Sequence, residues 1–281
     1  MEPRTAGRRR SRRLVAGVGL AAAAALLVLP ACTGTGGGSR MDEHEYLPGL
    51  DAYPHVPVDV KRAPVLVMVP GGAWKGADPA ALQPLAAALA DRGVFAMPVR
   101  IRAAGDGVVY PVPVEDILCA VADGAATARA DGIEPDRVVL LGHSSGAHLS
   151  SLATLDPAAY SPSCEDPLVA ADALVGLAGP YDIREFADPA SALFEEGADA
   201  AEWDAANPVL LAAQRPEVPV LLLHGTDDDL VPSSFSTEFG TALSSAGHPT
   251  TVRILPGEDH QSIYSAEAAA APIAAWLSAL Q

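Results

Sequence analysis

Basic residues are scarce in this sequence. Its 281 residues include 18 lysines and arginines against 35 aspartates and glutamates, which gives a net charge of −17 at pH 7. The first 31 residues contain six arginines and one glutamate, so a chain without that segment carries a charge of −22. Such an excess of negative charge argues against binding to nucleic acid or to anionic lipid head groups. It predicts a self-repelling surface that keeps the protein in solution.

Long apolar runs are scarce as well. The longest covers residues 14–29, 16 residues in all, fewer than the ~20 that span a bilayer. It follows the basic stretch 8–13 and precedes Ala31 and Cys32, an order that predicts a signal peptide over residues 1–31. Small residues before a cysteine at this point resemble the bacterial lipoprotein signal. We therefore expect a lipidated Cys32 that holds an exported protein at the outer face of a bacterial membrane.

For the predicted signal peptide, both the fate of the segment and the export route have alternatives. Plain secretion and an uncleaved anchor remain as alternatives to lipidation, and residues 11–13 match part of a twin-arginine export signal. The glycine-rich stretch 33–39 predicts a flexible linker over residues 32–50. Residues 51–281 are enough for one sizeable core and contain no internal repeat, so we expect a single domain there.

The sequence contains only three cysteines. If Cys32 is lipidated, Cys119 and Cys164 remain as two cysteines in an oxidising compartment, where disulfides form and persist. We therefore expect a disulfide between Cys119 and Cys164. Two free thiols are the alternative, because a sequence does not give the distance between them.

Apolar runs of strand length alternate with stretches suited to helices through most of the chain. Strands that are apolar on both faces, separated by helices, indicate an α/β fold with a mostly parallel sheet covered by helices on both faces. The expected strands are residues 65–69, 94–99, 138–141, 173–178, 220–223 and 251–255. The expected helices are residues 79–92, 114–130, 147–155, 233–246 and 267–280.

In such a sheet the functional groups lie on the loops that leave the carboxyl ends of the strands. One of these loops is Gly142-His143-Ser144-Ser145-Gly146, directly after the strand 138–141. A sharp strand-to-helix turn leaves no room for side chains at the two flanking positions, which explains glycine there, and it exposes the serine hydroxyl. The bare pattern also fits an ordinary glycine turn, so its context decides between the two interpretations.

The context favours Ser144 as a nucleophile over an ordinary glycine turn. Three aspartates, Asp227, Asp228 and Asp229, follow the strand 220–223, and His260 follows the strand 251–255. The chain order Ser…Asp…His is that of α/β-hydrolases. A serine needs a histidine to take its proton and a carboxylate to orient that histidine.

Further segments match the landmarks of one family. Residues 70–74 resemble its His-Gly-Gly-x-Trp oxyanion loop, and residues 142–149 its Gly-His-Ser-Ala-Gly-Gly-His-Leu motif; weaker matches are residues 99–101, 110–116, 180–182 and 207–208. From about residue 55 onward, the chain resembles the α/β-hydrolase esterases that include hormone-sensitive-lipase-like enzymes and feruloyl-esterase, acetyl-esterase and kynurenine-formamidase relatives. One departure is Pro70, where the family usually has a histidine that orders the loop.

The resemblance implies roles for individual residues. The family pattern His-Gly-x-x-Asp-x-x-Val-Pro, aligned with residues 224–232, selects Asp228 as the acid. The oxyanion donors are expected to be the backbone N–H groups of Gly72, Ala73 and Ser145. Trp74 is expected to form a wall of the pocket.

Residues 183–206 occupy the place of a cap or pocket wall, with an ordinary pair of surface helices as the alternative. Of the seven histidines, His143 and His148 are expected to pack or to hydrogen-bond, and His224 to fill a core position. No pair of histidines has metal-ligand spacing with a supporting carboxylate, so we expect neither metal nor cofactor.

The sequence therefore predicts a carboxylesterase whose partner is a small-molecule ester with a small or medium acyl group. A peptidase or amidase of prolyl-oligopeptidase or formamidase type on the same fold is the first alternative. A surface lipoprotein that binds a ligand without catalysis is the second, and it would be expected to lack a member of the triad.

Overall fold

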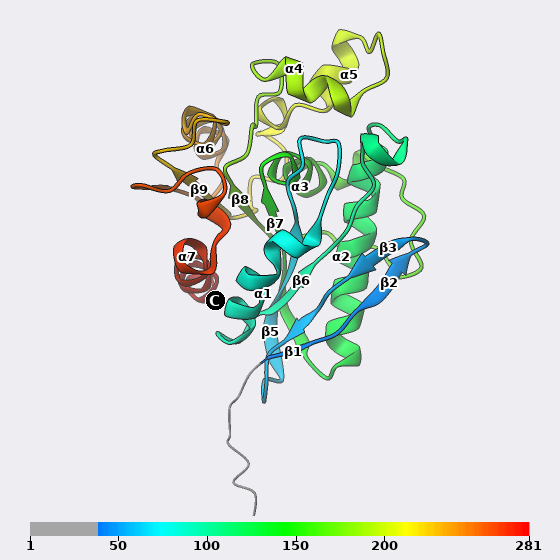
Figure 1. Cartoon of the computed structure of the whole chain (residues 1–281), viewed down its shortest axis with the longest axis vertical. Helices are drawn as coiled ribbons and strands as arrows, with labels where there is room; N and C mark the ends of the chain where they lie inside the picture. Colours follow the sequence, from blue (N-terminus) through cyan, green and yellow to red (C-terminus); the bar gives the residue numbers. More distant parts are fainter. Residues whose placement is uncertain (1–38, 281) are drawn as a thin grey trace, which may run out of the picture. The chain divides into compact units, whose positions relative to one another are not determined.

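The computed structural model describes residues 39–280, and its central feature is an eight-stranded sheet with the order β1-β4-β6-β5-β7-β8-β9-β10 (Figure 1). The strands of this sheet are β1 (Arg40–Met41), β4 (His55–Val56), β5 (Arg62–Val69), β6 (Phe95–Pro98), β7 (Glu134–His143), β8 (Ala173–Leu177), β9 (Val220–Gly225) and β10 (Thr250–Leu255). All pairs from β6 to β10 are parallel, whereas β1 and β4 are added antiparallel at one edge.

The helices alternate with these strands along the chain. The α-helices are α1 (Gln83–Ala90), α2 (Val112–Ala130), α3 (Ser145–Leu155), α4 (Ala187–Ala190), α5 (Ala200–Ala205), α6 (Ser234–Ala246) and α7 (Ala266–Ala279). Short 3₁₀ helices lie at Pro79–Leu82, Ala104–Asp106, Pro157–Ala159, Ser191–Leu193, Pro208–Leu211 and Ser262–Tyr264.

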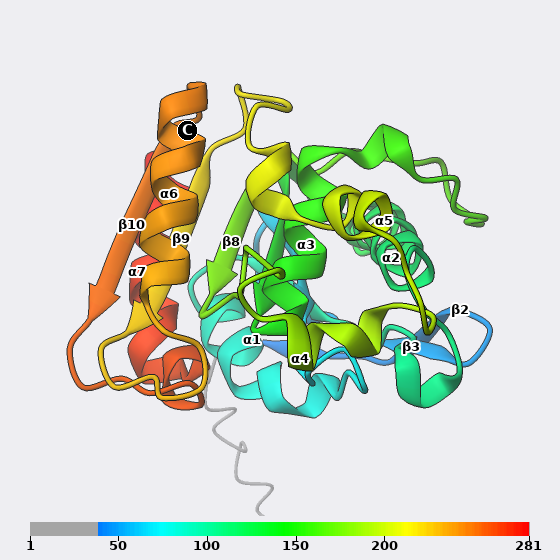
Figure 2. The same cartoon turned by 90° about the horizontal axis from the view of Figure 1, so that it is seen from above.

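The helices cover both faces of the sheet (Figures 1 and 2). Successive residues of a strand point to opposite faces, and β5 follows this rule: Val67 belongs to one apolar core, whereas Leu66 and Met68 belong to the other. Helices α2, α3 and α6 complete the first core, and α1 and α7 complete the second. The predicted fold class, a mostly parallel sheet with helices on both faces, is confirmed.

From residue 40 onward, the expected linker over residues 32–50 contains short strands. Arg40 of β1 pairs with Val56 of β4, and β2 (His44–Leu47) pairs with β3 (Leu50–Ala52) in a separate two-stranded sheet. Tyr46 and Leu50 are buried in the first core, and β2 contacts α2. These strands have two to four residues each, too few for a periodic pattern to emerge in the sequence.

The predicted signal peptide over residues 1–31 and Cys32 lie outside the described residues. Among the helices that the structure does describe, none is both long and apolar enough to cross a membrane. Cys119 of α2 and Cys164 of the loop before β8 form a disulfide, with their Cα atoms 5.1 Å apart. The bond ties that loop to α2 and connects positions 45 residues apart in the chain.

Candidate active site

Ser144 lies in the turn between β7 and α3, at the carboxyl edge of the sheet. Its backbone has φ 52° and ψ −125°, a strained conformation for a residue other than glycine. A Cβ on Gly142 would lie 2.3 Å from the carbonyl oxygen of Gly146, and one on Gly146 would lie 2.4 Å from that of Val69. Glycine is therefore required on both sides of Ser144, as the sequence analysis expected.

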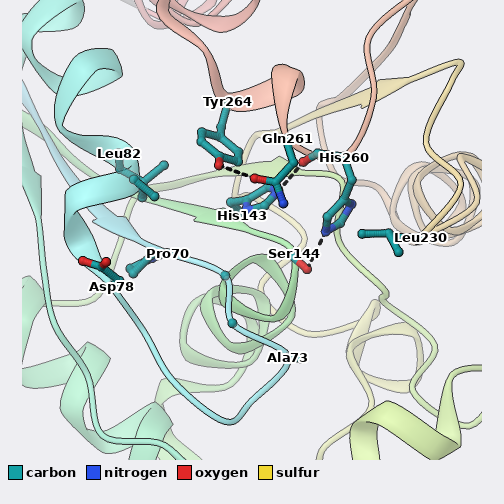
Figure 3. Close-up of a pocket in the computed structure, with 13 residues that line it drawn as sticks. Pro70, Ala73, Asp78, Leu82, His143, Ser144, Leu230, His260, Gln261 and Tyr264 are labelled. Atoms are coloured by element: carbon teal, nitrogen blue, oxygen red, sulfur yellow. Dashed lines mark hydrogen bonds between the residues drawn. The ribbon is translucent and has the colours of Figure 1, made fainter.

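A chain of hydrogen bonds runs from Ser144 into the protein. The Ser144 Oγ atom lies 2.9 Å from His260 Nε2 (Figure 3). On the other side of the ring, His260 Nδ1 lies 2.7 Å from Asp228 Oδ2. Because an ionised carboxylate only accepts hydrogen bonds, Nδ1 carries the proton, and Nε2 is free to accept from the hydroxyl group. This is the arrangement in which a histidine can take a proton from a serine.

Asp228 is held by donors on both of its oxygens. Oδ1 accepts the N–H groups of Leu230 at 2.9 Å and Val231 at 2.8 Å, whereas Oδ2 faces His260 and, at 3.1 Å, His224 Nε2. Its side chain is fully buried. Burial alone would raise the pKa of Asp228, but the hydrogen bonds from the two histidines and Val231 outweigh it and lower the pKa below its ordinary value of 3.8. The carboxylate is therefore ionised at neutral pH.

The two neighbouring aspartates are placed differently. Asp227 and Asp229 are exposed, and Asp227 accepts a hydrogen bond from the hydroxyl group of Thr226 at 2.7 Å. Of the three adjacent carboxylates, Asp228 is the one that reaches His260. The structure thus brings Ser144, Asp228 and His260 together.

His224 fills a core position, as expected, but it also touches the acid. Its Nε2–H points between Asp228 Oδ2, at 3.1 Å, and the carbonyl oxygen of Val231, at 2.8 Å, while its Nδ1 lies 2.7 Å from the hydroxyl group of Ser236. This contact was not predicted from the sequence. The spacing of four residues between His224 and Asp228, across a tight turn, is the signal that could have indicated it.

His143 holds the backbone of His260 in place. Its Nε2–H donates to the backbone carbonyl of His260 at 2.8 Å, and its ring lies 4.5 Å from that of Tyr264, measured between centroids. Burial lowers the pKa of His143 to about 3, so its ring is neutral near pH 7. His143 therefore fixes the backbone position of His260 without adding charge.

The loop Pro70–Trp74, which we call the Gly-Gly loop, lies beside Ser144. Ala73 and Trp74 both have positive φ, 52° and 58°. The Gly72 N–H donates to the side-chain Oγ of Ser145 at 3.1 Å. The expectation that Gly72 supplies an oxyanion donor is therefore revised, because its N–H group already has an acceptor within the protein.

The other two expected donors remain unused. The Ala73 N–H donates to no protein acceptor within residues 39–280. Ser145 is the first residue of α3, a position whose N–H group has no partner inside the helix. The backbone N–H groups of Ala73 and Ser145 are thus the available donors next to Ser144.

Trp74 differs from its expected place in the pocket wall. Its indole is buried, with 3% of the residue exposed, and Nε1–H donates to His148 Nδ1 at 3.1 Å. The ring also lies 6.3 Å from that of Phe186, measured between centroids. The reason is the positive φ of Trp74, which turns its side chain into the protein, where His148 offers an acceptor for the indole N–H.

Ser144 and His260 open onto a cavity of about 350 Å³ (Figure 3). Its lining includes the large apolar side chains of Leu82, Leu230 and Tyr264. The remaining lining residues are Pro70, Gly71, Gly72, Ala73, Asp78, Ala81, His143 and Gln261. None of residues 183–206, expected as a cap or pocket wall, lines this cavity, although Phe186 and Ala206 contact Trp74 and His148 beneath it. Within the described part of the chain, no group of three or more histidines, cysteines or acidic residues could hold a metal ion.

Comparison with known proteins gives the family. Esterase LipQ of Mycobacterium tuberculosis (strain ATCC 25618 / H37Rv) is 31% identical over 220 residues, which cover 71% of this chain and 50% of LipQ. The probable isoprenylcysteine alpha-carbonyl methylesterase ICME of Oryza sativa subsp. japonica is 28% identical and covers 76% of this chain and 55% of its own length. The chain thus spans about half the length of these relatives.

Among solved structures, a truncated form of a carbohydrate esterase from gut microbiota has a similar fold, with a TM-score of 0.70 at 19% identity. The match covers 86% of this chain and 96% of that one. The resemblance to α/β-hydrolase esterases drawn from the sequence is confirmed. The BD-FAE family model matches residues 50–243, well over half of the chain, and the protein belongs to the BD-FAE family.

Proposed function

We propose that this protein is a serine carboxylesterase in which Ser144 is the nucleophile, His260 the general base and Asp228 the residue that orients His260. The observation that carries the proposal is the unbroken hydrogen-bond chain from Asp228 through His260 to Ser144 at the wall of an open cavity. The names of LipQ and ICME, an esterase and a methylesterase, also support ester hydrolysis.

The acylation step follows from this chain. Ser144 Oγ attacks the carbonyl carbon of the ester while its proton moves to His260 Nε2, and ionised Asp228 stabilises the imidazolium that forms. The tetrahedral intermediate then collapses, the bond to the alcohol oxygen breaks, and His260 returns the proton to that oxygen. The acyl group is left on Ser144.

Deacylation repeats the same steps with water. His260 takes a proton from the water as it attacks the acyl carbon, and the carboxylic acid leaves as Ser144 regains its proton. In both steps, negative charge develops on the former carbonyl oxygen. The N–H groups of Ala73 and Ser145 are the donors that we assign to this oxygen, because both are free and flank Ser144.

The cavity suits a compact substrate. A volume of about 350 Å³ with Leu82 and Leu230 in its lining fits an ester with a small or medium acyl group.

We also propose that the protein is exported and held at the membrane by a lipid on Cys32. Incorporation of labelled palmitate that disappears in Cys32→Ser, with retention of the protein in the membrane fraction, tests this localisation.

The decisive experiment uses Ser144→Ala. We expect covalent labelling by a fluorophosphonate to disappear and kcat to fall by on the order of 10⁴ or more. Ser151→Ala, which removes a buried hydroxyl of α3, the helix that follows Ser144, is the control and should label normally. A labelled Ser144→Ala with the adduct on Ser145 would show that the nucleophile is misassigned.

A panel of p-nitrophenyl esters of graded acyl length, each with its matched anilide, defines the substrate. We expect kcat/KM to peak at short acyl chains and to be higher for esters than for anilides. Preference for the anilides would instead support the amidase alternative. A wild-type protein that neither labels nor hydrolyses any member would support the ligand-binding alternative.

A further inference from the structure

The Gly-Gly loop has a conformation that needs support. Ala73 and Trp74 are consecutive residues other than glycine with positive φ, and such backbone persists only where the surrounding structure holds it. Pro70, the first residue of the loop, has no N–H with which to tether it. Two backbone bonds act on the loop: Lys75 N–H donates to the Gly72 carbonyl at 2.9 Å, and Ala104 N–H donates to the Trp74 carbonyl at 3.0 Å. Neither of them joins the loop to α3.

Two side chains of α3 hold the part of the loop that faces Ser144. Ser145 Oγ accepts the Gly72 N–H at 3.1 Å, and His148 Nδ1 accepts the Trp74 Nε1–H at 3.1 Å. Residues three apart lie on the same side of a helix, so both acceptors face the loop. Their two partners are the residues immediately before and after Ala73.

The His148 tether depends on which ring nitrogen carries the proton. His148 Nε2–H donates to the backbone carbonyl of Ala206 at 2.8 Å, which leaves Nδ1 unprotonated and able to accept from Trp74. The ring is fully buried, and burial lowers the pKa of His148 to about 4, so this tautomer persists at neutral pH. Ser145 is also buried, with 2% of the residue exposed, so water does not compete for its hydroxyl oxygen.

We propose that Ser145 and His148 are positioning residues that hold the Gly-Gly loop against α3, so that the Ala73 N–H stays beside the Ser145 N–H. Ser145 then has two tasks: its N–H faces the developing oxyanion, and its side chain sets how far away the second donor lies. The inference rests on the proposed hydrolase function. It adds two side chains that act on the reaction through the backbone, without touching the substrate.

The test compares Ser145→Ala with Ser151→Ala in the full-length protein. Alanine stands at position 145 in the motif that this segment resembles, so we expect the variant to fold. Loss of donor alignment should lower kcat on the order of tenfold with KM nearly unchanged, since a small misplacement of an oxyanion donor acts on the transition state. The inhibition constant of a trifluoromethyl ketone, which mimics the tetrahedral intermediate, should rise by the same factor. Ser151→Ala loses only its bond to the carbonyl of Ala147 and should retain both values.

The second tether is tested through its donor and its acceptor. Trp74→Phe removes the indole N–H and keeps an aromatic ring, and His148→Leu removes the acceptor. We expect each to lower kcat by a similar factor, and the double variant to be no worse than the poorer single one. His148→Asn, whose amide oxygen lies near the position of Nδ1, should recover much of the lost rate.

Hydrogen exchange separates this inference from the proposed function. Gly72 is an exposed residue whose N–H bonds to Ser145 Oγ, so its amide exchange should accelerate at least tenfold in Ser145→Ala and stay unchanged in Ser151→Ala. Faster exchange in a protein without esterase activity would support the tether and overturn only the proposed function. Unchanged exchange, kcat and inhibitor binding in Ser145→Ala would overturn the inference.

Discussion

The candidate site has two walls that are built in different ways. The first, the charged wall, consists of Asp228 and the residues that donate to it, and the second is the Gly-Gly loop. Around Asp228, four donors converge on one buried carboxylate, and two of them are histidine side chains. In the Gly-Gly loop, the available donor is the backbone N–H of Ala73, and the side chains of Ser145 and His148 bond the residues on either side of it. The first wall places a charge, whereas the second places dipoles.

The difference determines how each wall can fail. A carboxylate can be removed by one substitution, and its loss leaves a histidine without orientation or counter-charge. A backbone N–H survives almost every substitution, so the second wall can be displaced but not deleted. We therefore expect steep losses from changes around Asp228 and graded losses from changes around Ala73.

The largest contrast should appear among the three adjacent aspartates. We expect Asp228→Asn to lower kcat by on the order of 10⁴, because an amide can donate to His260 Nδ1 and favour the wrong tautomer. Asp227→Asn and Asp229→Asn should stay within a few-fold of wild type, since both side chains are exposed and neither contacts His260. Kinetics of the three variants on one ester measure this. A large loss of kcat in Asp227→Asn or Asp229→Asn, with near wild-type kcat in Asp228→Asn, would contradict the assignment of the acid.

Lowering the pH should destabilise both walls, because a buried neutral histidine hydrogen-bonds to each: His143 to His260 in the charged wall and His148 to Trp74 in the Gly-Gly loop. The pKa of His143 is lowered to about 3 and that of His148 to about 4, from an ordinary value of 6.5, mainly by burial. A histidine with a lowered pKa in the folded state contributes its full stability above pH 6.5 and loses it as the pH falls towards the folded value. Between pH 7 and pH 5 the two residues together should reduce the free energy of unfolding by roughly 4 kcal/mol.

Urea unfolding at pH 7, 6 and 5 measures this loss. His148→Asn, which carries no titrating ring, should show a smaller decrease over the same range, by about half of the predicted amount. An unfolding free energy that stays level between pH 7 and pH 5 would mean that neither ring is held neutral in the folded protein.

The same contrast explains what the sequence could reveal. The turn around Ser144 was predictable because its Gly-x-Ser-x-Gly pattern directly follows an apolar strand; Gly142 is required by a contact with Gly146 four residues away, although Gly146 is required by the distant carbonyls of Val69 and Pro70. The positions of Asp228 and His260 followed from strand ends, since parallel strands deliver their loops to one edge. The inward turn of Trp74 was not predictable, because it depends on His148, an acceptor 74 positions away in the chain.

A side chain that acts by holding a backbone group in place is difficult to recognise from the sequence. Nothing about Ser145 distinguishes its hydroxyl from that of any other helix serine until Gly72 is placed beside it in three dimensions. The short antiparallel strands β1 to β4 were missed for a related reason, as each is defined by its pairing partner and carries almost no periodic pattern of its own. Elements with strong local determinants were therefore predicted, and those that depend on distant partners were not.

The smallest of the predicted effects concerns His224, the second histidine on Asp228. His224→Leu removes one of the two side-chain donors to Oδ2 and leaves His260 Nδ1 as the other. We expect kcat to fall on the order of tenfold with KM unchanged, because one hydrogen bond to a charged group contributes roughly 1.5–3 kcal/mol and part of it is recovered by relaxation. The pKa of Asp228, followed by carbon-13 NMR of its carboxyl group, should rise towards its ordinary value.

Two variants decide whether His224 acts through the acid or merely fills the core. His224→Gln can still present an N–H where Nε2 lies and should recover much of the rate. His248→Leu removes another buried histidine, which hydrogen-bonds the carbonyls of Val218 and Ala212 and touches no residue of the Ser144–His260–Asp228 chain. If His248→Leu lowers kcat as much as His224→Leu at equal loss of stability, the effect comes from core packing. If only His224→Leu does so, the charged wall extends one residue beyond the triad, to a side chain that the substrate never meets.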